Sequence, residues 1–278
     1  MPRTALIDAD ILLYELGFSS QGKGDEGEIV PASWDWARDL IERKIDLIVD
    51  EAEADKALLF LTNTPRINKM LNKERKREEK PKKEYVPNFR DEVAKEKDYK
   101  GNRKSAKPFH FYNILSHFLF NYDTMIHEDG LEADDYMCIT QYKSWQDGDT
   151  IICSRDKDVR QCPGWHYSWE VGGQASIGPM FVDPLGELKL IEKTNAKGKK
   201  LPPKLFGTGH KFFYAQMIMG DAVDNIGGVK GRGPVFAHAL LNDLKTEREL
   251  YEIVAEKYVL AWQDEWKTKM REQADLLW

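Results

Sequence analysis

Cysteine and long apolar runs are both scarce in this 278-residue sequence. The three cysteines, Cys138, Cys153 and Cys162, form no Cys-x-x-Cys pair, so neither a disulfide framework nor a zinc site is indicated. No apolar run approaches the roughly 18 residues of a membrane span, and the N-terminus leads into a short apolar strand without a signal-peptide profile. We therefore expect a soluble, intracellular protein with no membrane partner. Its 41% hydrophobic content can bury a sizeable core.

The charge is distributed unevenly along the chain. Although the net charge is -6, the segment 64–107 holds 16 Lys and Arg against 8 Asp and Glu, a balance of +8. The remainder holds 25 against 39, a balance of -14. A basic segment on an acidic body suits a polyanionic ligand held by the first and metal ions held by the second.

Two acidic clusters mark the ends of one helix-then-strand unit. Glu132, Asp134 and Asp135 begin the helix, and Asp156 and Asp158 follow the strand at 150–154. Carboxylates gathered in this way repel one another unless a cation compensates them, and oxygen ligands favour magnesium or manganese. Each cluster alone also fits helix capping, since Asp129 and Glu132 have capping-box spacing. The two clusters together favour a metal site.

The apolar segments predict an α/β fold. Short strands at 4–7, 57–61, 125–126, 151–154 and 166–171 alternate with helical patterns at 33–54 and 109–122, which is typical of a mainly parallel, twisted sheet with helices on both faces. Asp8 and Asp10 follow the first strand, where the carboxyl ends of parallel strands bind ligands. Gly22 to Gly27 reads as a loop, 172–192 as a hairpin region, and 195–200 as a second basic loop.

The charged segment is expected to project from this domain. Residues 66–104 have few apolar side chains and suit an exposed helix that breaks at Pro81. The segment ends in Tyr99, Lys100, Asn102, Arg103 and Lys104 around Gly101, a set suited to phosphate contacts.

A glycine-rich turn lies in the helical C-terminal third. Gly228, Gly231 and Gly233 are interleaved with Lys230 and Arg232, and Pro234 suits the first turn of the next helix. Such a turn presents free N–H groups to an anion. Asp221 and Asp224 lie one turn upstream.

These motifs resemble those of the flap endonuclease and 5′-3′ exonuclease family, most of all those of its bacteriophage members. They also occur in the same order along the chain as in that family. The matching stretches are Ile7-Asp8 with Leu12 and Tyr14, 99–103, 132–135, Ser154 with 156–158, and 220–234. The resemblance implies a PIN-like α/β domain at 1–190 with a helical arch at about 64–107. It also implies a helical DNA-binding region at 205–278 with a helix-three-turn-helix at 220–240.

The resemblance also implies roles for individual residues. Lys100 and Arg103 would approach the scissile phosphate, and Tyr99, Lys104, Gly228, Lys230, Gly231, Arg232 and Gly233 would contact DNA. The metal ligands would be Asp8, Glu132, Asp134, Asp135, Asp156, Asp158, Asp221 and, as a weaker candidate, Asp224. Asp10 would lie behind the ligands. Asn63 departs from the family, which commonly has an aspartate there; an amide can hold a metal-bound water but adds no charge.

The implied activity is magnesium-dependent hydrolysis of DNA near 5′ ends. Two ions roughly 4 Å apart, with manganese as a substitute, would activate water and stabilise the attacking and leaving oxygens. The substrates would be 5′ ends, flaps and nicked or gapped duplexes, and RNA would be tolerated in hybrids. The protein would act in the cytoplasm of a bacterial cell, including a phage-infected cell. A monomer is the default. The alternatives are a structure-selective DNA-binding protein with a degenerate metal site and a PIN-like ribonuclease.

Overall fold

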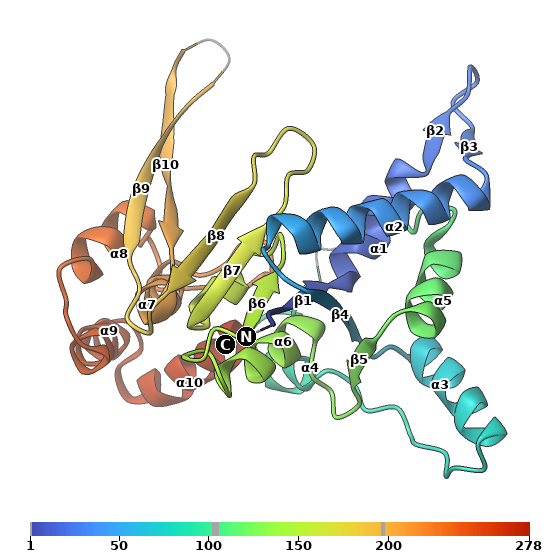
Figure 1. The fold of residues 1–278 in the computed structure, drawn as a ribbon. Helices are drawn as coiled ribbons and strands as arrows, with labels where there is room; N and C mark the ends of the chain where they lie inside the picture. The colour runs from blue at the N-terminus through green and yellow to red at the C-terminus, as the bar shows by residue number, and fades with distance from the viewer. Residues whose placement is uncertain (1, 102–105, 196–197) are drawn as a thin grey trace. The chain divides into compact units, whose positions relative to one another are not determined.

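A six-stranded sheet organises the first part of the chain (Figure 1). Its strands, in spatial order, are β5 (Thr124–His127), β4 (Lys56–Thr62), β1 (Thr4–Asp8), β6 (Thr150–Cys153), β7 (Gly164–Ser168) and β8 (Ile177–Val182). The pairs β5–β4, β4–β1, β1–β6 and β6–β7 are parallel. The predicted mainly parallel sheet is confirmed, and the first five predicted strands lie within a few residues of their expected bounds.

The computed structural model describes residues 2–101, 106–195 and 198–278, and these divide into two compact units. The first unit comprises Met1–Asn88, Lys104–Val159 and Gly164–Phe181. The second comprises Phe89–Arg103, Arg160–Pro163 and Val182–Trp278. A short 3-10 helix, η1, spans Asp158–Gln161. Among the described residues, no helix combines the length and apolar character that a membrane span requires.

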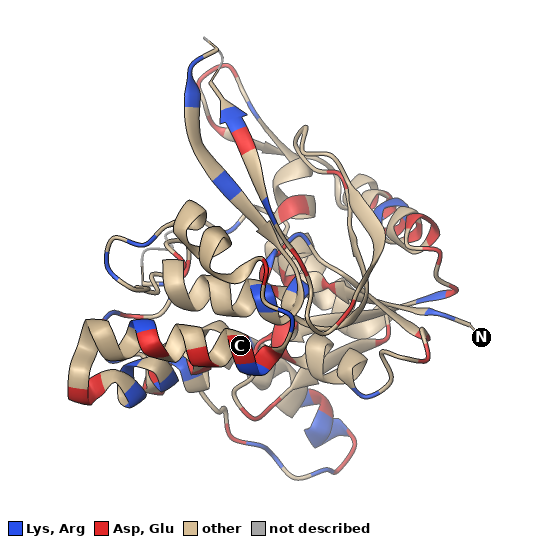
Figure 2. Cartoon of the chain, turned by 90° about the vertical axis from the view of Figure 1, so that its left-hand side faces the viewer, with Lys and Arg blue, Asp and Glu red and all other residues tan. Residues whose placement is uncertain are grey.

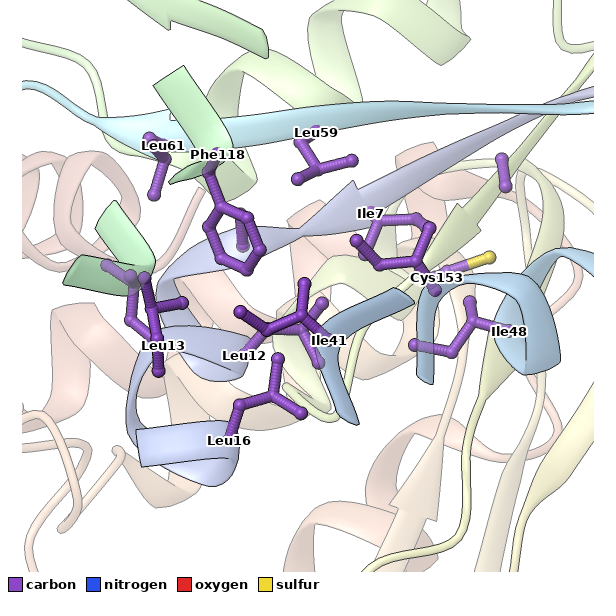
Figure 3. Close-up of a cluster of buried hydrophobic side chains, with 14 of the residues drawn as sticks. Ile7, Leu12, Leu13, Leu16, Ile41, Ile48, Leu59, Leu61, Phe118 and Cys153 are labelled. Atoms are coloured by element: carbon purple, nitrogen blue, oxygen red, sulfur yellow. The ribbon is translucent and has the colours of Figure 1, made fainter. Parts of the chain in front are cut away.

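Helices cover both faces of the sheet. Helices α1 (Ala9–Ser19), α2 (Trp34–Glu51) and α5 (Phe111–Asn121) share one buried cluster with alternate residues of β1, β4 and β6. Figure 3 shows this core, in which Ile7, Leu59 and Cys153 meet Leu12, Ile41 and Phe118. Helix α6 (Ala133–Tyr142) packs on the opposite face, where Tyr136 makes an edge contact with Phe60. Alternate side chains along each strand therefore pack into two apolar layers, one on each face of the sheet.

The charged segment folds back on its own helix. Helix α3 (Pro65–Arg77) is capped by the Thr64 hydroxyl and ends at Arg77 rather than at Pro81, because Glu79 takes a positive φ of 57°. The Asn72 side chain then binds the backbone N–H and C=O of Lys83 at 2.9 and 2.7 Å. Residues 80–88 form neither helix nor strand.

An ion pair holds the far end of α3 to the body of the first unit. The Arg75 guanidinium donates to both carboxylate oxygens of Glu128, which follows β5, and Lys83 Nζ lies 3.3 Å from the same carboxylate. These donors hold the pKa of Glu128 below its usual value against the opposing effect of its partial burial. In this structure the segment up to residue 77 is a packed helix.

The predicted loop at 22–27 is partly confirmed, since 24–27 form a turn while Gly22 and Lys23 belong to a strand. Residues 22–27, predicted to form a loop, lie largely within a two-stranded ribbon of β2 (Gln21–Lys23) and β3 (Ile29–Pro31) and its turn.

The second unit is helical with one long hairpin. Its elements are α4 (Phe89–Val93), β9 (Leu188–Thr194), β10 (Lys200–Gly207), α7 (Gly209–Met219), α8 (Pro234–Leu241), α9 (Glu247–Trp262), η2 (Gln263–Glu265) and α10 (Trp266–Leu277). Its core includes Phe212, Ile218, Leu250 and Tyr258. Arg90 is buried here, and its guanidinium donates to the backbone carbonyls of Leu276 and Trp278.

The expected hairpin at 172–192 is wrong. Residues 177–182 form β8 of the large sheet, and the hairpin of the second unit is the antiparallel pair β9–β10. Of the predicted basic loop at 195–200, Asn195, Gly198 and Lys199 lie between the two strands and Lys200 begins β10, while residues 196–197 lie outside the described residues. The strands of this hairpin carry several basic residues (Figure 2). The sequence pattern misled because Pro202 and Pro203 interrupt the strand, and the ladder shifts register around them.

Candidate metal centre and DNA-binding turn

The first-unit carboxylates lie at the carboxyl ends of parallel strands. Asp8 is the last residue of β1 and the N-cap of α1, where its carboxylate accepts the Ile11 N–H at 3.3 Å. It is 4% exposed. Burial, together with the charges of Asp10 and Asp156, raises the pKa of Asp8 to about 7, although a hydrogen bond from Ser154 opposes the rise. This carboxylate needs a positive charge to stay ionised at low cost.

Ser154 connects the ends of β1 and β6. Its hydroxyl donates to Asp8 Oδ2 at 2.8 Å, and the same hydroxyl oxygen accepts the N–H of Asp156 at 2.9 Å. The Asp156 carboxylate in turn accepts the N–H of Asp158 at 2.9 Å. Asp158 also pairs with Lys157 Nζ at 2.8 Å. Asp8 and Asp156 are therefore neighbours, while Asp158 already has a cation beside it.

Thr62 connects β4 to the start of α6. Its N–H donates to the Asp10 carboxylate at 3.1 and 3.3 Å, and its hydroxyl accepts the N–H of Ala133 at 2.9 Å. The Asp10 carboxylate thus fixes the backbone at the end of β4. These hydrogen bonds form a continuous path from α1 through the end of β4 to the acidic start of α6.

Glu132, Asp134 and Asp135 lie together at that helix start. Each offers a carboxylate oxygen, and these oxygens lie within 4.8 Å of one another; within residues 2–101, 106–195 and 198–278 this is the one such group of potential ligands. Glu132 is the N-cap and forms a capping box with Asp135, whose carboxylate accepts the Glu132 N–H at 2.9 Å. The capping box therefore involves Glu132 and Asp135 rather than Asp129 and Glu132. Capping and ligand roles coincide on the same side chains.

Asn63 directly follows β4 and is 6% exposed. Neither its Oδ1 nor its Nδ2 has a hydrogen-bond partner among the described residues. A buried amide without partners is costly, so this position calls for an additional polar group such as water, a hydrated ion or a phosphate. The oxygen-only donor set at this edge of the sheet suits magnesium or manganese.

Asp221 and Asp224 belong to the second unit, at the turn after α7. Both are buried, at 6% and 9% exposure. The Asp221 carboxylate accepts the Val223 N–H at 2.8 Å and the Gln216 side-chain amide at 3.3 Å, and Gln216 itself accepts from Gln161. These contacts fix the orientation of Asp221 within its own unit.

Lys100 lies beside the same turn. Its N–H donates to the Asp224 carbonyl at 3.2 Å, and its ammonium lies 4.8 Å from the ring centre of Tyr99. The Asn225 amide donates to the Asp98 carbonyl at 3.0 Å, which joins the two segments a second time. Arg103 and Lys104 lie outside the described residues.

The glycine-rich turn separates into two parts. A Cβ on Gly228 would lie 2.2 Å from the backbone nitrogen of Gly220, so Gly228 is needed for packing within the turn rather than for approach to a ligand. Gly231, at a φ of 73°, and Gly233 have open space around the Cβ position. Lys230 and Arg232 are both exposed, and Gly233 caps α8 without a side-chain hydrogen bond.

Sequence reasoning missed the connecting roles of the hydroxyls and amides in this site. Thr62 and Ser154 carry the hydrogen bonds between strand ends, and Gln216 orients Asp221. A hydroxyl residue at or just after the end of a buried strand, beside an acid, was the available signal for Thr62 and Ser154. No local pattern singled out Gln216.

No family model and no curated protein matches this chain. Solved structures do match it over its whole length. A variant of the bacteriophage T5 5′-exonuclease matches with a TM-score of 0.45 and 13% identity over 100% of both chains. The bacteriophage T5 flap endonuclease, in a pseudo-enzyme–product complex with DNA and metal ions, matches with a TM-score of 0.46 and 13% identity over 99% of both.

A third match is the T5 5′-exonuclease with bound zinc, with a TM-score of 0.48 and 13% identity over 99% of this chain and 100% of that one. These proteins are of the kind that the sequence motifs resemble. At such identities and TM-scores, the functional proposal rests on the residues of this chain.

Proposed function

We propose that this chain is a divalent-metal-dependent nuclease that hydrolyses DNA phosphodiester bonds near 5′ ends, as a 5′-3′ exonuclease or flap endonuclease. The observation that carries the proposal is the continuous edge of oxygen donors in the first unit. Hydrogen bonds through Ser154 join the ends of β1 and β6, and a hydrogen bond through Thr62 joins the end of β4 to the acidic start of α6. Metal-dependent hydrolysis of a phosphodiester uses oxygen ligands of this kind to hold its divalent ions.

The ligands proposed for the first unit are Asp8, Glu132, Asp134, Asp135, Asp156 and Asp158. Bound divalent cations would activate water for attack on phosphorus and stabilise the departing oxygen. Asn63 would hold water or a phosphate oxygen with its unpaired amide, and Asp10 would keep Thr62 in place. Asp221 and Asp224 are proposed as metal ligands of the second unit.

The second unit is proposed to position the substrate. Lys100 and Arg103 would offset the charge that develops on the phosphate during reaction. Lys230 and Arg232, with the free N–H groups at the start of α8, would bind a duplex phosphate. Tyr99, Gly231 and Gly233 would line the same contacts, and Lys104 of the first unit is also proposed to contact DNA. We expect recognition of a free 5′ end, branch or gap rather than of base order.

The test is cleavage of a 5′-labelled flap and a nicked duplex with Mg²⁺, with Mn²⁺ and with EDTA. We expect cleavage with either ion and none with EDTA. Binding of the branched DNA without cleavage under any condition would favour the structure-selective binding protein. Preferential cleavage of an RNA strand of the same shape would favour the ribonuclease. The magnesium requirement, the cytoplasmic setting and the monomeric state remain predictions.

A further inference from the structure

Two cations converge on one exposed tyrosine in the first unit. The Arg66 guanidinium carbon lies 3.7 Å from the ring centre of Tyr112, and Lys107 Nζ lies 4.9 Å from the same centre. Lys107 Nζ also donates to the Tyr112 hydroxyl at 3.1 Å and lies 4.7 Å from the Phe111 ring centre. Helices α3 and α5, which carry Arg66 and Tyr112, are neighbours in Figure 1.

Neither cation is neutralised. Within the described part of the chain, no carboxylate forms an ion pair with Arg66 or Lys107; their contacts are with the aromatic rings and the phenol. The hydrogen bond from Lys107 and the two positive charges lower the pKa of the Tyr112 phenol against a smaller opposing effect of burial. A guanidinium stacked on a ring keeps its N–H edge available, and a phosphate matches that edge.

The backbone beside the cations is fixed. Pro108 packs so closely on α1 that a Cβ on Gly17 would lie 2.3 Å from it. The N–H of Phe109 donates to the Gln21 side-chain carbonyl at 2.8 Å, and the buried His110 ring lies 2.8 Å from the Ala32 carbonyl oxygen through Nε2. Lys107 and Phe109 therefore project from a held segment, which lowers the entropy cost of binding.

Phe109, two residues after Lys107 in the chain, exposes its ring. The residue is 62% exposed, and its ring makes an edge contact with His110 at 5.0 Å. Aromatic rings beside cations bind single-stranded nucleic acid, because unstacked bases can lie on the ring while the cations hold the backbone. A duplex keeps its bases stacked, so it cannot place a base on the ring and gains little from this site.

We propose that Arg66, Lys107 and Tyr112 form a phosphate-binding site for single-stranded DNA, with Phe109 as the surface on which an adjacent base stacks. The proposal rests on the proposed nuclease function and gives it a site for the unpaired strand. Arg66 lies three residues after Asn63, so the site begins where the oxygen-donor edge of β4 ends.

The test measures binding without metal, so that it does not depend on catalysis. A fluorescent 20-nucleotide oligo(dT) and a 20-base-pair blunt duplex are titrated in EDTA, by anisotropy, at several salt concentrations. We expect Arg66→Gln with Lys107→Gln to weaken oligo(dT) binding about 10-fold and to lower the salt slope by about 1.4, with duplex binding changed less than about 2-fold. Phe109→Ala should weaken oligo(dT) binding by a similar factor without changing the slope.

The matched control removes one arginine and one lysine elsewhere in the first unit. Arg43 lies in α2 and Lys56 at the amino end of β4, both exposed. Arg43→Gln with Lys56→Gln should leave the oligo(dT) salt slope within about 0.3 of the original. Tyr112→Phe keeps the ring and should retain most of the binding, whereas Tyr112→Leu should not.

Unchanged oligo(dT) affinity and slope in the Arg66/Lys107 variant would overturn the site, as would equal losses for oligo(dT) and duplex. The nuclease proposal is judged separately by flap cleavage of the original protein with Mg²⁺. A protein that cleaves flaps but shows no effect of Arg66→Gln with Lys107→Gln loses only the single-strand site. A protein that shows the effect but never cleaves loses only the nuclease function.

Discussion

The N-termini of α6 and α8 are built in opposite ways. The start of α6 gathers Glu132, Asp134 and Asp135, whose carboxylates satisfy backbone N–H groups of the same helix. The start of α8 has no side-chain cap and lies beside the cations Lys230 and Arg232. Because every helix start carries partial positive charge, the first arrangement compensates it and the second adds to it.

The difference indicates which ligand each helix start suits. Three carboxylates exceed what one helix start can neutralise, so α6 favours an additional cation. Free N–H groups with two cations favour an additional anion at α8. A helix start with surplus negative charge therefore suits a metal ion, and a helix start with surplus positive charge suits a phosphate.

The largest effect is expected when the acids of α6 are neutralised. Asp134→Asn with Asp135→Asn should lower flap cleavage with Mg²⁺ by about 10³-fold, because charge stabilisation of the reacting groups is removed. The control is Asp35→Asn, an exposed acid in the first turn of α2, which should cleave at the original rate. Similar rates for all three proteins would show that the α6 acids serve only as caps.

Asp8, the N-cap of α1, tests what burial does to an acid at a helix start. Its pKa is raised from 3.8 to about 7, so the folded state binds the proton more tightly than the unfolded state does. Metal-free protein should therefore lose up to about 4 kcal/mol of unfolding free energy as the pH rises from about 4 through 7.

Asp8→Asn removes this loss. Urea unfolding in EDTA should show the variant to be more stable than the original at pH 8, with a much smaller advantage at pH 5. The advantage should shrink when Mg²⁺ is added, because only the original gains from the ion. An advantage that is equal at both pH values would contradict the role of the ionised Asp8.

A smaller effect is expected at α8. Lys230→Gln with Arg232→Gln should weaken duplex binding about 10-fold and lower the salt slope by about 0.9 for each phosphate that the variant no longer binds. Lys267→Gln with Arg271→Gln removes the same charges from α10 and serves as the control. Equal slopes in the two variants would remove α8 from the duplex-binding surface.

The smallest effect comes from adding a cap to α8. Gly233→Ser should supply the missing side-chain acceptor and raise the unfolding free energy by a few tenths of a kcal/mol, measured as a rise in Tm. Gly231→Ser is the matched control, since a side chain at its φ of 73° is strained and should lower Tm. A lower Tm for both variants would show that Gly233 is needed for reasons other than capping.

The sequence predicted the sheet well because its strands are short, apolar and flanked by polar turns. It also located the acids, since Asp8 and Asp156 lie at or just beyond the ends of such strands. Contacts between distant residues were inaccessible to it. Nothing local shows that Asp10 binds the Thr62 N–H, that Asn63 is buried without partners, or that Arg66 stacks on Tyr112.

Gly228 illustrates the remaining limit of sequence reasoning. A glycine beside cations suggested room for a ligand, whereas its hydrogen lies against the backbone of Gly220. Both interpretations predict glycine, so only coordinates separate them. Likewise, Pro81 marked a break in the charged helix, but the backbone at Glu79 had already ended it.

The Asn72 side chain closes residues 73–82 into a loop anchored at its own base. Since both backbone groups of Lys83 are bound there, and Arg75 and Lys83 both contact Glu128, the chain leaves and returns at one place. When the ends of a loop are held together, extra residues add little to the conformational entropy cost of closing it. We expect residues 78–81 to accept inserted peptides or fluorescent tags while the sheet keeps its stability, which makes this loop the natural site for a reporter.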